Sequence, residues 1–219
     1  MELEQELREQ ICEIGKRIYD RGMVAANDGN ISVQMSENVF LCTPTGISKG
    51  FMTPDCICKV DQSGTLIEEN GTYKPSSELK MHMRVYEKRP DIKAVVHAHP
   101  LYATAYAVAG IPLDQPIIAE AVLMLGTVPV APYASLSTME VPDSITPFLP
   151  DHDAVLLANH GALTYSDSLL SAYYKMESLE HYAHLSYLSK ELGARNIPEA
   201  EVERIVALRP KFGLDTRAK

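Results

Sequence analysis

The stretch Lys93-Ala-Val-Val-His97-Ala-His99-Pro100 decides the fold, because it predicts a buried strand with a defined end. Its alanines and valines are typical of such a strand, and the proline stops it and begins a helix that is predicted to end at Gly110. Side chains two residues apart on a strand point to the same face. His97 and His99 are therefore predicted to lie together where the strand ends.

Outward from this strand, helix patterns alternate with short β-rich runs. Apolar residues at helical spacing predict an opening helix over 2–21, and the runs NISV, NVFLCT, CICKVD and GTLIE predict strands between residues 29 and 67. A helix capped by a serine at 76–77 is expected to end near residue 88, and further helices are expected over 100–110, 167–192 and 198–208. Further strands are expected over 128–132 and 153–159. The expected fold is α/β, a single domain over residues 1–219 with helices flanking a central, mainly antiparallel or mixed sheet.

Composition excludes several classes of partner. The formal net charge of −9 comes from interleaved acids and bases without a run of lysine or arginine, so the chain lacks the basic surface that nucleic acid or anionic lipid requires. No apolar stretch reaches the roughly 20 residues that span a bilayer, and the acidic start MELEQELREQ is unlike a signal peptide. We expect a cytoplasmic protein whose four cysteines, without CxxC spacing, are reduced and fill the core.

A third histidine follows another apolar run. His160 comes directly after AVLLAN, and Gly161 permits a tight turn there. A single histidine in an apolar strand is usually a satisfied core residue, but two on one face are costly to bury without a shared cation or several acceptors. If the two strand ends are adjacent, three imidazoles meet. Three neutral nitrogens suit Zn²⁺ best and leave a coordination position open, although Mn²⁺, Co²⁺ and Fe²⁺ accept similar ligands.

The long helix carries a second candidate metal set at i, i+3 and i+4 spacing, formed by Glu177, Glu180, His181 and His184. An ordinary solvated or interface face is the favoured interpretation of these four residues. His82, in the middle of a predicted helix, and His152, in a predicted loop, are assigned no catalytic role.

Three short polar segments have turn chemistry: Asp28-Gly29-Asn30, Thr43-Pro-Thr45-Gly46 and Ser76-Ser77-Glu78. Each is typical of a turn or a helix cap, and each also presents backbone N–H groups or hydroxyls that can bind an anion. The nucleotide-phosphate motifs GxxxxGK[ST] and GxGxxG do not occur in the sequence, so nucleotide binding receives no support.

Six short motifs occur in order along the chain: GNISV at 29–33, TPTGIS at 43–48, SSE at 76–78, HAHP at 97–100, PY at 132–133 and NHG at 159–161. As a set they resemble the class II aldolase/adducin family over about residues 5–190. The aldolases that act on L-fuculose 1-phosphate are the most similar members. The resemblance implies a nine-stranded, mainly antiparallel sheet and a homotetramer with active sites at subunit interfaces.

The resemblance also implies roles for individual residues. Zn²⁺ would be held by His97, His99 and His160, and Glu78 would both ligate the resting metal and act as acid/base. The phosphate of a small sugar substrate would lie among Gly29, Asn30, Thr45, Gly46, Ser76 and Ser77.

The implied reaction is cleavage of the C3–C4 bond of a ketose 1-phosphate to dihydroxyacetone phosphate and a small aldehyde. L-fuculose 1-phosphate and a 5-deoxypentulose 1-phosphate are the expected substrates. The metal would stabilise the negative charge of the enediolate, and Glu78 would transfer the proton at C3.

One residue departs from the family pattern. In the fuculose enzymes, a tyrosine after the HxH strand is expected to reach the site from the neighbouring subunit as the second acid/base, but the equivalent segment 115–122 contains no tyrosine. We hypothesise that Glu120 takes this role, and an ordinary surface or interface carboxylate is the alternative. The C-terminal segment RPKFGLDTRAK also lacks the tyrosine expected near the end of the fuculose enzymes.

Glu120 keeps related activities open. Pentulose-phosphate 4-epimerisation, methylthioribulose-1-phosphate dehydration and decarboxylation of a phosphorylated oxo-acid are alternatives for the same site. A non-catalytic, adducin-like interaction module is disfavoured because the three histidines and Glu78 are all present. A purely structural metal site is disfavoured because three histidines leave a coordination position open.

Overall fold

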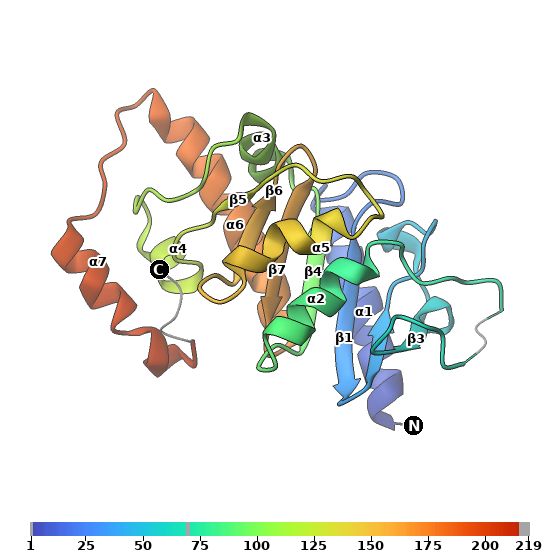
Figure 1. The fold of residues 1–219 in the computed structure, drawn as a ribbon. Helices are drawn as coiled ribbons and strands as arrows, with labels where there is room; N and C mark the ends of the chain where they lie inside the picture. Colours follow the sequence, from blue (N-terminus) through green and yellow to red (C-terminus); the bar gives the residue numbers. More distant parts are fainter. Residues whose placement is uncertain (1, 69–70, 215–219) are drawn as a thin grey trace.

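A computed structural model describes residues 2–68 and 71–214. Helices cover both faces of one central sheet (Figure 1), which confirms the predicted α/β fold. Over the described residues, the sheet has seven strands in the order β3-β2-β1-β4-β7-β6-β5, and every pair is antiparallel except β5 with β6. The strands are β1 (Asn30–Ser36), β2 (Val39–Cys42), β3 (Cys58–Asp61), β4 (Ala94–Ala98), β5 (Val130–Ala131), β6 (Ala154–Leu157) and β7 (Gly161–Ser166).

The predicted helices at 2–21, 100–110, 167–192 and 198–208 are confirmed with small shifts at their ends. The α-helices are α1 (Glu2–Asp20), α2 (Leu79–Lys88), α3 (Leu101–Ala109), α4 (Ala119–Met124), α5 (Glu140–Ile145), α6 (Leu169–Lys190) and α7 (Glu199–Val206). Short 3-10 helices are η1 (Lys49–Phe51), η2 (Pro54–Cys56), η3 (Thr146–Phe148) and η4 (Arg209–Phe212). Among the helices described, none is both long and apolar enough to cross a membrane.

The strand β4 lies at the centre of the sheet and is buried along its whole length. It pairs with β1 on one side, where His97 is opposite Asn30, and with β7 on the other, where His97 is opposite Leu163. Alternate residues of β4 face different cores: Val96 packs in the core that contains α1, α3 and α6, and Val95 in the core that contains α2 and α5. His97 is two residues from Val95 and therefore projects toward the face that α2 covers.

Several expected elements are wrong in detail. The nine strands implied by the resemblance are seven in the part of the chain that the structure describes. The run GTLIE forms no strand, since Leu66 makes only an isolated bridge with Val60, and the apolar run at 128–132 is reduced to the two residues of β5. The elements β7, α4 and α5 occur where the sequence predicts none. The helices α4 and α5 are only six residues long each, and β7 is placed by its pairing with β4 and β6 more than by a local pattern.

The serine cap predicted for α2 is wrong in position, although Ser76 Oγ accepts a hydrogen bond of 3.4 Å from the N–H of Glu78 just before the helix. Glu78 occupies the N-cap position of α2, and its side chain makes no capping hydrogen bond. The backbone before Glu78 pairs with another segment instead: the N–H of Thr45 donates to the carbonyl of Lys74 at 2.8 Å, and the N–H of Ser76 donates to the carbonyl of Thr43 at 3.3 Å. This pairing keeps the serines out of the helix and aligns residues 74–76 with residues 43–45.

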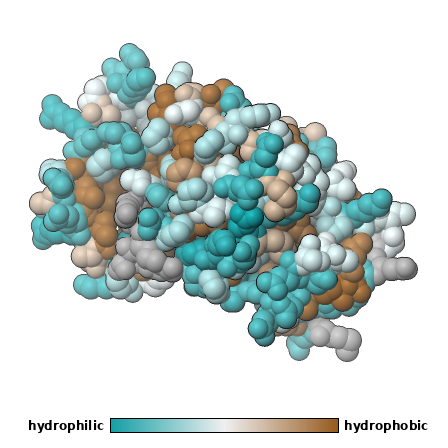
Figure 2. Space-filling view, viewed as in Figure 1, coloured by the Kyte–Doolittle hydropathy of each residue, from teal (hydrophilic) through white to brown (hydrophobic). Residues whose placement is uncertain are grey.

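Exposed apolar side chains gather over α3 and the adjacent end of α6 (Figure 2). The largest of them on and next to these helices are Leu101, Val108, Ile111, Tyr187, Leu188 and Leu192. Scattered apolar side chains are normal on a protein surface, but a contiguous group of them is typical of a surface that packs against another chain.

Four charged side chains form a network that joins α2, β6 and α6. Asp153 accepts hydrogen bonds from Arg89 at 3.0 Å and from Lys175 at 2.8 Å, and Arg89 also pairs with Asp91 at 2.8 Å. Asp153, Arg89 and Lys175 are buried. Burial alone would raise the pKa of Asp153, but the charges of Lys175 and Arg89 lower it below its usual value. The carboxylate therefore stays ionised between its two cations.

Replacing Asp153 with alanine should lower the free energy of unfolding by about 3–5 kcal/mol, because it leaves Lys175 buried without a carboxylate. Urea denaturation at pH 7 measures the change. The folded pKa of Asp153 is lowered, so its contribution is present above the unfolded pKa of about 3.9 and is lost as the pH falls through the folded value.

The control for this experiment is Asp20→Ala, which removes an exposed pair with Lys16 and should change the free energy of unfolding little. Equal stability of the wild type and Asp153→Ala at pH 7 would contradict the role assigned to the network.

Candidate functional site

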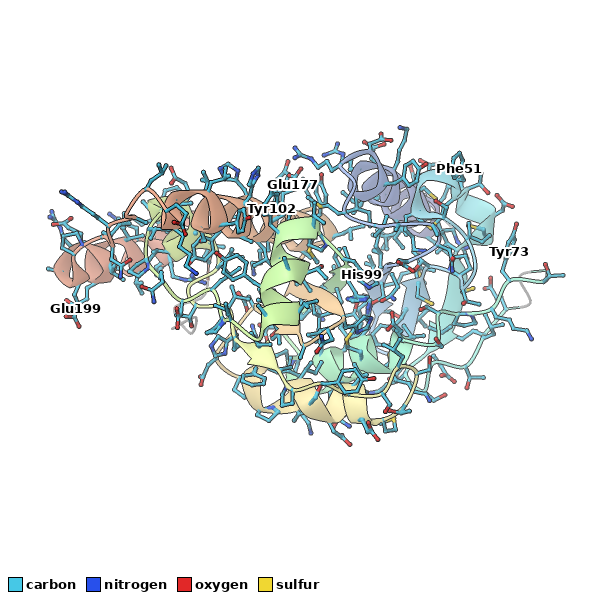
Figure 3. The ribbon with its side chains drawn as sticks, turned by 90° about the horizontal axis from the view of Figure 1, so that it is seen from above. Phe51, Tyr73, His99, Tyr102, Glu177 and Glu199 are labelled. Carbon is cyan, nitrogen blue, oxygen red and sulfur yellow. The ribbon has the colours of Figure 1, made fainter. Side chains whose placement is uncertain are left out.

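The three histidines predicted to bind a metal lie together at one end of the sheet. His97 belongs to β4, His99 follows that strand, and His160 precedes β7. Their ligand nitrogens lie within 4.8 Å of one another, and the Nε2 atoms of His97 and His99 are 3.1 Å apart. Figure 3 shows His99 in the middle of the molecule, beside the strands. Residues from distant parts of the sequence thus form one group that can hold a metal ion.

Hydrogen-bond acceptors fix the orientation of two of the rings. His97 Nδ1 lies 2.9 Å from the carbonyl oxygen of Ala162, and His99 Nδ1 lies 3.3 Å from a carboxylate oxygen of Asp28. Both oxygens can only accept, so each Nδ1 carries the proton and each Nε2 keeps its lone pair. The two lone pairs meet at one place, which is the arrangement that a shared cation stabilises.

Burial keeps these rings neutral. It lowers the pKa of His97 to about 3, and burial together with the charge of His160 lowers the pKa of His99. Only the neutral imidazole can ligate a metal. His97 and His99 therefore have the form that ligates a metal at physiological pH.

Glu78 completes the group from the start of α2. One carboxylate oxygen is 3.0 Å from His160 Nε2, and the other is 3.5 Å from His97 Nε2 and accepts a hydrogen bond of 2.7 Å from Asn30 Nδ2. Burial alone would raise the pKa of Glu78, but its hydrogen bonds with His160 and Asn30 lower it, so the carboxylate is ionised. Three imidazoles and one carboxylate are a ligand set that Zn²⁺ accepts.

Two glycines let the backbone approach the rings closely. A Cβ at Gly161 would lie 2.6 Å from the carbonyl oxygen of Ala98 and 2.6 Å from His99 Cδ2, and a Cβ at Gly29 would lie 2.9 Å from the carbonyl oxygen of His97. Gly29 also has a φ of +76°, which residues with a side chain rarely adopt. The glycines of GNISV and NHG are therefore required for a steric reason.

The three segments expected to bind phosphate converge beside Glu78. Segments 43–46 and 74–77 run side by side through the backbone pairing described above. Thr43 Oγ1 accepts a hydrogen bond of 3.1 Å from the N–H of Ile31, which joins both segments to the start of β1. Thr45, Gly46 and Ser77 are exposed, Ser76 is half-buried, and Gly29 and Asn30 are buried.

Two contacts at the site are not predicted from the sequence. Asp28 holds the ring of His99, and Asn30, expected only as a phosphate ligand, also orients the carboxylate of Glu78. The available signal is that both residues flank Gly29, whose close approach to β4 brings the whole loop against the histidines. Ser77, by comparison, has a hydroxyl partner 3.0 Å away in Ser137.

Glu120 lies apart from this group in its own chain. It is exposed in the first turn of α4, and α4 packs against α6 and α7. In the described part of the chain, no hydrogen bond or ion pair joins Glu120 to the histidines or to Glu78. Glu199, at the start of α7, lies at the far end of the molecule from His99 in Figure 3. The described contacts of its own chain therefore give Glu120 no role beside the histidines.

The candidate metal set on the long helix serves the structure instead. Glu180 accepts hydrogen bonds from the backbone N–H groups of Tyr102 and Ala103 at the start of α3, and His184 stacks on Tyr102 with ring centroids 3.8 Å apart. Glu177 pairs with Arg21. The favoured interpretation from the sequence is an ordinary solvated or interface face; the contacts give the face an ordinary structural role, but with Glu180 and His184 packed against α3 of the same chain. His82 is likewise a buried core residue, 2.7 Å from the hydroxyl of Ser32.

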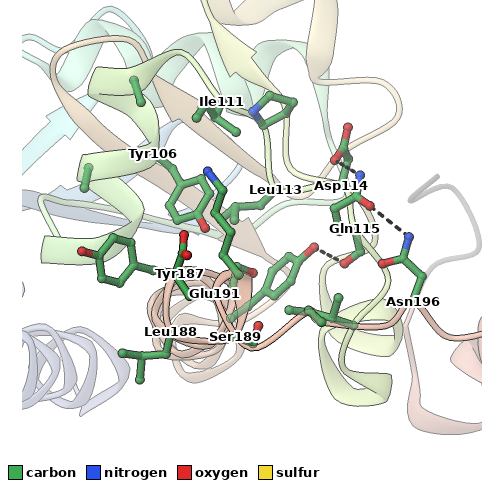
Figure 4. Close-up of a pocket in the computed structure, with 18 of the residues that line it drawn as sticks. Tyr106, Ile111, Leu113, Asp114, Gln115, Tyr187, Leu188, Ser189, Glu191 and Asn196 are labelled. Carbon is green, nitrogen blue, oxygen red and sulfur yellow. Dashed lines mark hydrogen bonds between the residues drawn. The ribbon is translucent and has the colours of Figure 1, made fainter.

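A cavity of about 940 Å³ lies between α3, residues 111–117 and the C-terminal end of α6 (Figure 4). Tyr106 and Leu113 line it, and hydrogen bonds of Gln115 with Tyr182 and Asn196 hold one edge. The residues that line this cavity include neither the histidines nor any of the predicted phosphate ligands. We assign it no catalytic role.

The comparison with known proteins points to one family. The model described as Class II Aldolase and Adducin N-terminal domain matches residues 9–187. An L-fuculose phosphate aldolase of Methanococcus maripaludis is 33% identical over 84% of this chain and 97% of its own. A 5-deoxy-D-ribulose 1-phosphate aldolase of Bacillus thuringiensis is 34% identical over 92% of this chain and 94% of its own.

Two further similarities extend this result. A 3-oxo-tetronate 4-phosphate decarboxylase of Escherichia coli K12 is 30% identical over 93% of this chain and 96% of its own. A solved structure of an L-fuculose 1-phosphate aldolase superposes with a TM-score of 0.86 at 32% identity, covering 95% of this chain and 97% of that one. The similarity therefore spans members with different reactions.

Asp28→Ala should weaken metal binding by about 10- to 100-fold, because the ring of His99 loses the acceptor that orients it. Competition with a chromophoric chelator measures the affinity for Zn²⁺. The exposed Asp20→Ala variant serves as the matched control and should bind Zn²⁺ like the wild type. Wild-type affinity in Asp28→Ala would mean that His99 needs no partner at Nδ1.

Proposed function

The chain belongs to the class II aldolase and adducin family, and we propose that it is a metal-dependent aldolase acting on a ketose 1-phosphate. The observation that carries this proposal is the convergence of the histidines and Glu78 with segments 43–46 and 74–77. L-fuculose 1-phosphate and 5-deoxyribulose 1-phosphate are the proposed substrates, since relatives at 33% and 34% identity are named for aldolases of these sugars.

Zn²⁺ is the proposed metal, with His97, His99, His160 and Glu78 as its ligands before substrate arrives. When bound, the metal would supply a Lewis acid for the negative charge that develops as the C3–C4 bond breaks. The chain supplies the preorganisation. Ala162 and Asp28 hold two of the rings with Nε2 facing inward, so the ligands need little rearrangement.

The phosphate of the substrate is proposed to bind between the converging loops. Gly29, Gly46 and Ser77 offer backbone N–H groups, Thr45, Ser76 and Ser77 offer hydroxyls, and Asn30 offers an amide, all of them uncharged donors. These donors lie beside Glu78, so a bound phosphate would hold the sugar carbons next to the metal ligands. Binding energy at the phosphate would thereby orient the bond that breaks.

Glu78 is the proposed acid/base at C3. During synthesis the ionised carboxylate would remove a proton from C3 of the three-carbon fragment. During cleavage the carboxyl group, once protonated by solvent, would return a proton to C3. Asn30 keeps the carboxylate oriented through its 2.7 Å hydrogen bond. A carboxylate that is ionised and within reach of the substrate carbon can serve as the base of this reaction.

Glu120 is proposed to act on the C4 hydroxyl in the site of a neighbouring chain. Because no contact ties it to the histidines of its own chain, the proposal includes a homotetramer with sites at subunit interfaces. The exposed apolar side chains over α3 and α6 support association with another chain.

Decarboxylation of a phosphorylated oxo-acid is the second candidate, favoured by the 30% identity to 3-oxo-tetronate 4-phosphate decarboxylase. Loss of CO₂ from a 3-oxo acid leaves the same kind of enediolate as cleavage of a ketose, so Glu78 and the metal ligands suit both reactions. The departing groups differ. An aldehyde forms only when a hydroxyl proton is removed, whereas CO₂ leaves from a carboxylate that has no such proton.

The zinc-loaded protein should release dihydroxyacetone phosphate from L-fuculose 1-phosphate or 5-deoxyribulose 1-phosphate, measured by coupling the product to NADH oxidation. Glu78→Gln should lower kcat by about 10²–10⁴-fold, because it removes the acid/base group while keeping the side-chain size. The control is Glu87→Gln, an exposed position of the same helix, which should keep wild-type turnover. Product from neither ketose would exclude the aldolase proposal, and CO₂ release from 3-oxo-tetronate 4-phosphate would then favour the second candidate.

Glu120→Gln should lower kcat for ketose cleavage by about 100-fold or more, because the C4 hydroxyl loses its base. The matched control is Glu199→Gln, which changes an exposed glutamate.

Mixed oligomers of Glu78→Gln and Glu120→Gln chains should regain about a quarter of the active sites. If each site takes Glu78 from one chain and Glu120 from its neighbour, a random pair of neighbours supplies both intact residues with this frequency. Wild-type turnover in Glu120→Gln would identify an ordinary surface carboxylate, and absence of complementation would exclude a shared site.

A further inference from the structure

Lys49 is a buried lysine behind the proposed phosphate-binding loops. Lys49 is the first residue of η1, and η1 packs against α1. The packing is close: a Cβ added at Gly15 of α1 would lie 2.9 Å from the carbonyl oxygen of Lys49. Only 1% of Lys49 is exposed. Its ammonium donates to the carbonyl of Asn27 at 3.0 Å and to the carbonyl of Ile47 at 2.7 Å.

The two carbonyls belong to different loops of the site. Asn27 lies two residues before Gly29, and Ile47 follows Gly46 directly. One ammonium therefore joins the loop that leads into β1 to the loop that pairs with residues 74–76. Its loss would free the two loops to move relative to each other.

The ammonium of Lys49 forms no ion pair within the described residues, and Asp28 and Glu78 act on it only at longer range. Over residues 2–68 and 71–214, no carboxylate lies within ion-pair distance of its ammonium. Lys175, with 2% exposed, is equally buried but pairs with Asp153 at 2.8 Å. Burying an unpaired cation is unfavourable, and such groups are typical of sites that receive a charged ligand.

We propose that Lys49 is a positioning residue for the substrate phosphate, whose ammonium joins the two phosphate-binding loops and supplies the positive charge that their neutral donors lack. This inference rests on the proposed phosphate pocket. It narrows the ligand to a dianionic phosphate monoester, because a buried cation attracts a dianion more strongly than a monoanion at the same distance.

The state of the ammonium supports this role. Burial lowers the pKa of Lys49 to about 8, against the charges of Asp28 and Glu78, which act in the opposite direction. The side chain is therefore still a cation at neutral pH. A phosphate dianion would add to the charges that favour the protonated form.

Lys49→Met and Lys49→Gln test the inference. Methionine removes both the charge and the donor, whereas glutamine keeps an N–H donor without the charge. We expect both variants of the zinc-loaded protein to bind inorganic phosphate roughly 10- to 100-fold more weakly in isothermal titration calorimetry. The affinity for Zn²⁺ should stay within about twofold of the wild type, since Lys49 contacts none of the proposed metal ligands. With an accepted sugar, KM should rise more than kcat falls.

The matched control is Lys175→Met, which removes a lysine of equal burial from the network around Asp153. It should lower the unfolding temperature and leave phosphate affinity unchanged. Wild-type phosphate affinity in Lys49→Gln would overturn the role of the charge, and an equal loss in Lys175→Met would overturn the assignment to Lys49. If Lys49→Met does not fold, the glutamine variant alone decides. Calorimetry needs no turnover, so failure of this inference and failure of the aldolase proposal are separate results.

Discussion

The hydrogen bond from His97 to the carbonyl of Ala162 is the contact on which the candidate site depends. The backbone of His97 belongs to the ladder between β1, β4 and β7, and its ring is held by a residue of the strand beside it. Turning the ring would break this hydrogen bond inside a fully buried part of the sheet. The position of one metal ligand is thus as rigid as the most deeply buried strand of the protein.

The parts of the site that could be predicted are those with a local pattern. The alternation of a strand places His97 and His99 on one side, and Gly161 after His160 signals the turn that brings the third ring close. The family resemblance predicts Glu78 and the loops, and the structure brings them together beside the histidines.

The parts that could not be predicted depend on distant partners. The serines at 76–77 have the composition of a helix cap, but their backbone pairs with residues more than 30 positions earlier in the chain, and no local pattern encodes such pairing. Lys49 has the same limit, since its burial results from packing against α1. Short helices such as α4 and α5 were not predictable because their apolar residues are too few to show a period.

The surroundings of the metal ligands and the surroundings of Glu120 differ in how readily they accept an amino-acid substitution. The metal ligands are enclosed by backbone, and at Gly29 and Gly161 there is no room even for a methyl group. Glu120 lies exposed on a short helix that touches none of them. A substitution on the exposed face of α4 can therefore change the chemistry of that surface while the backbone around the histidines stays as it is, whereas a side chain at Gly29 or Gly161 would have to displace that backbone.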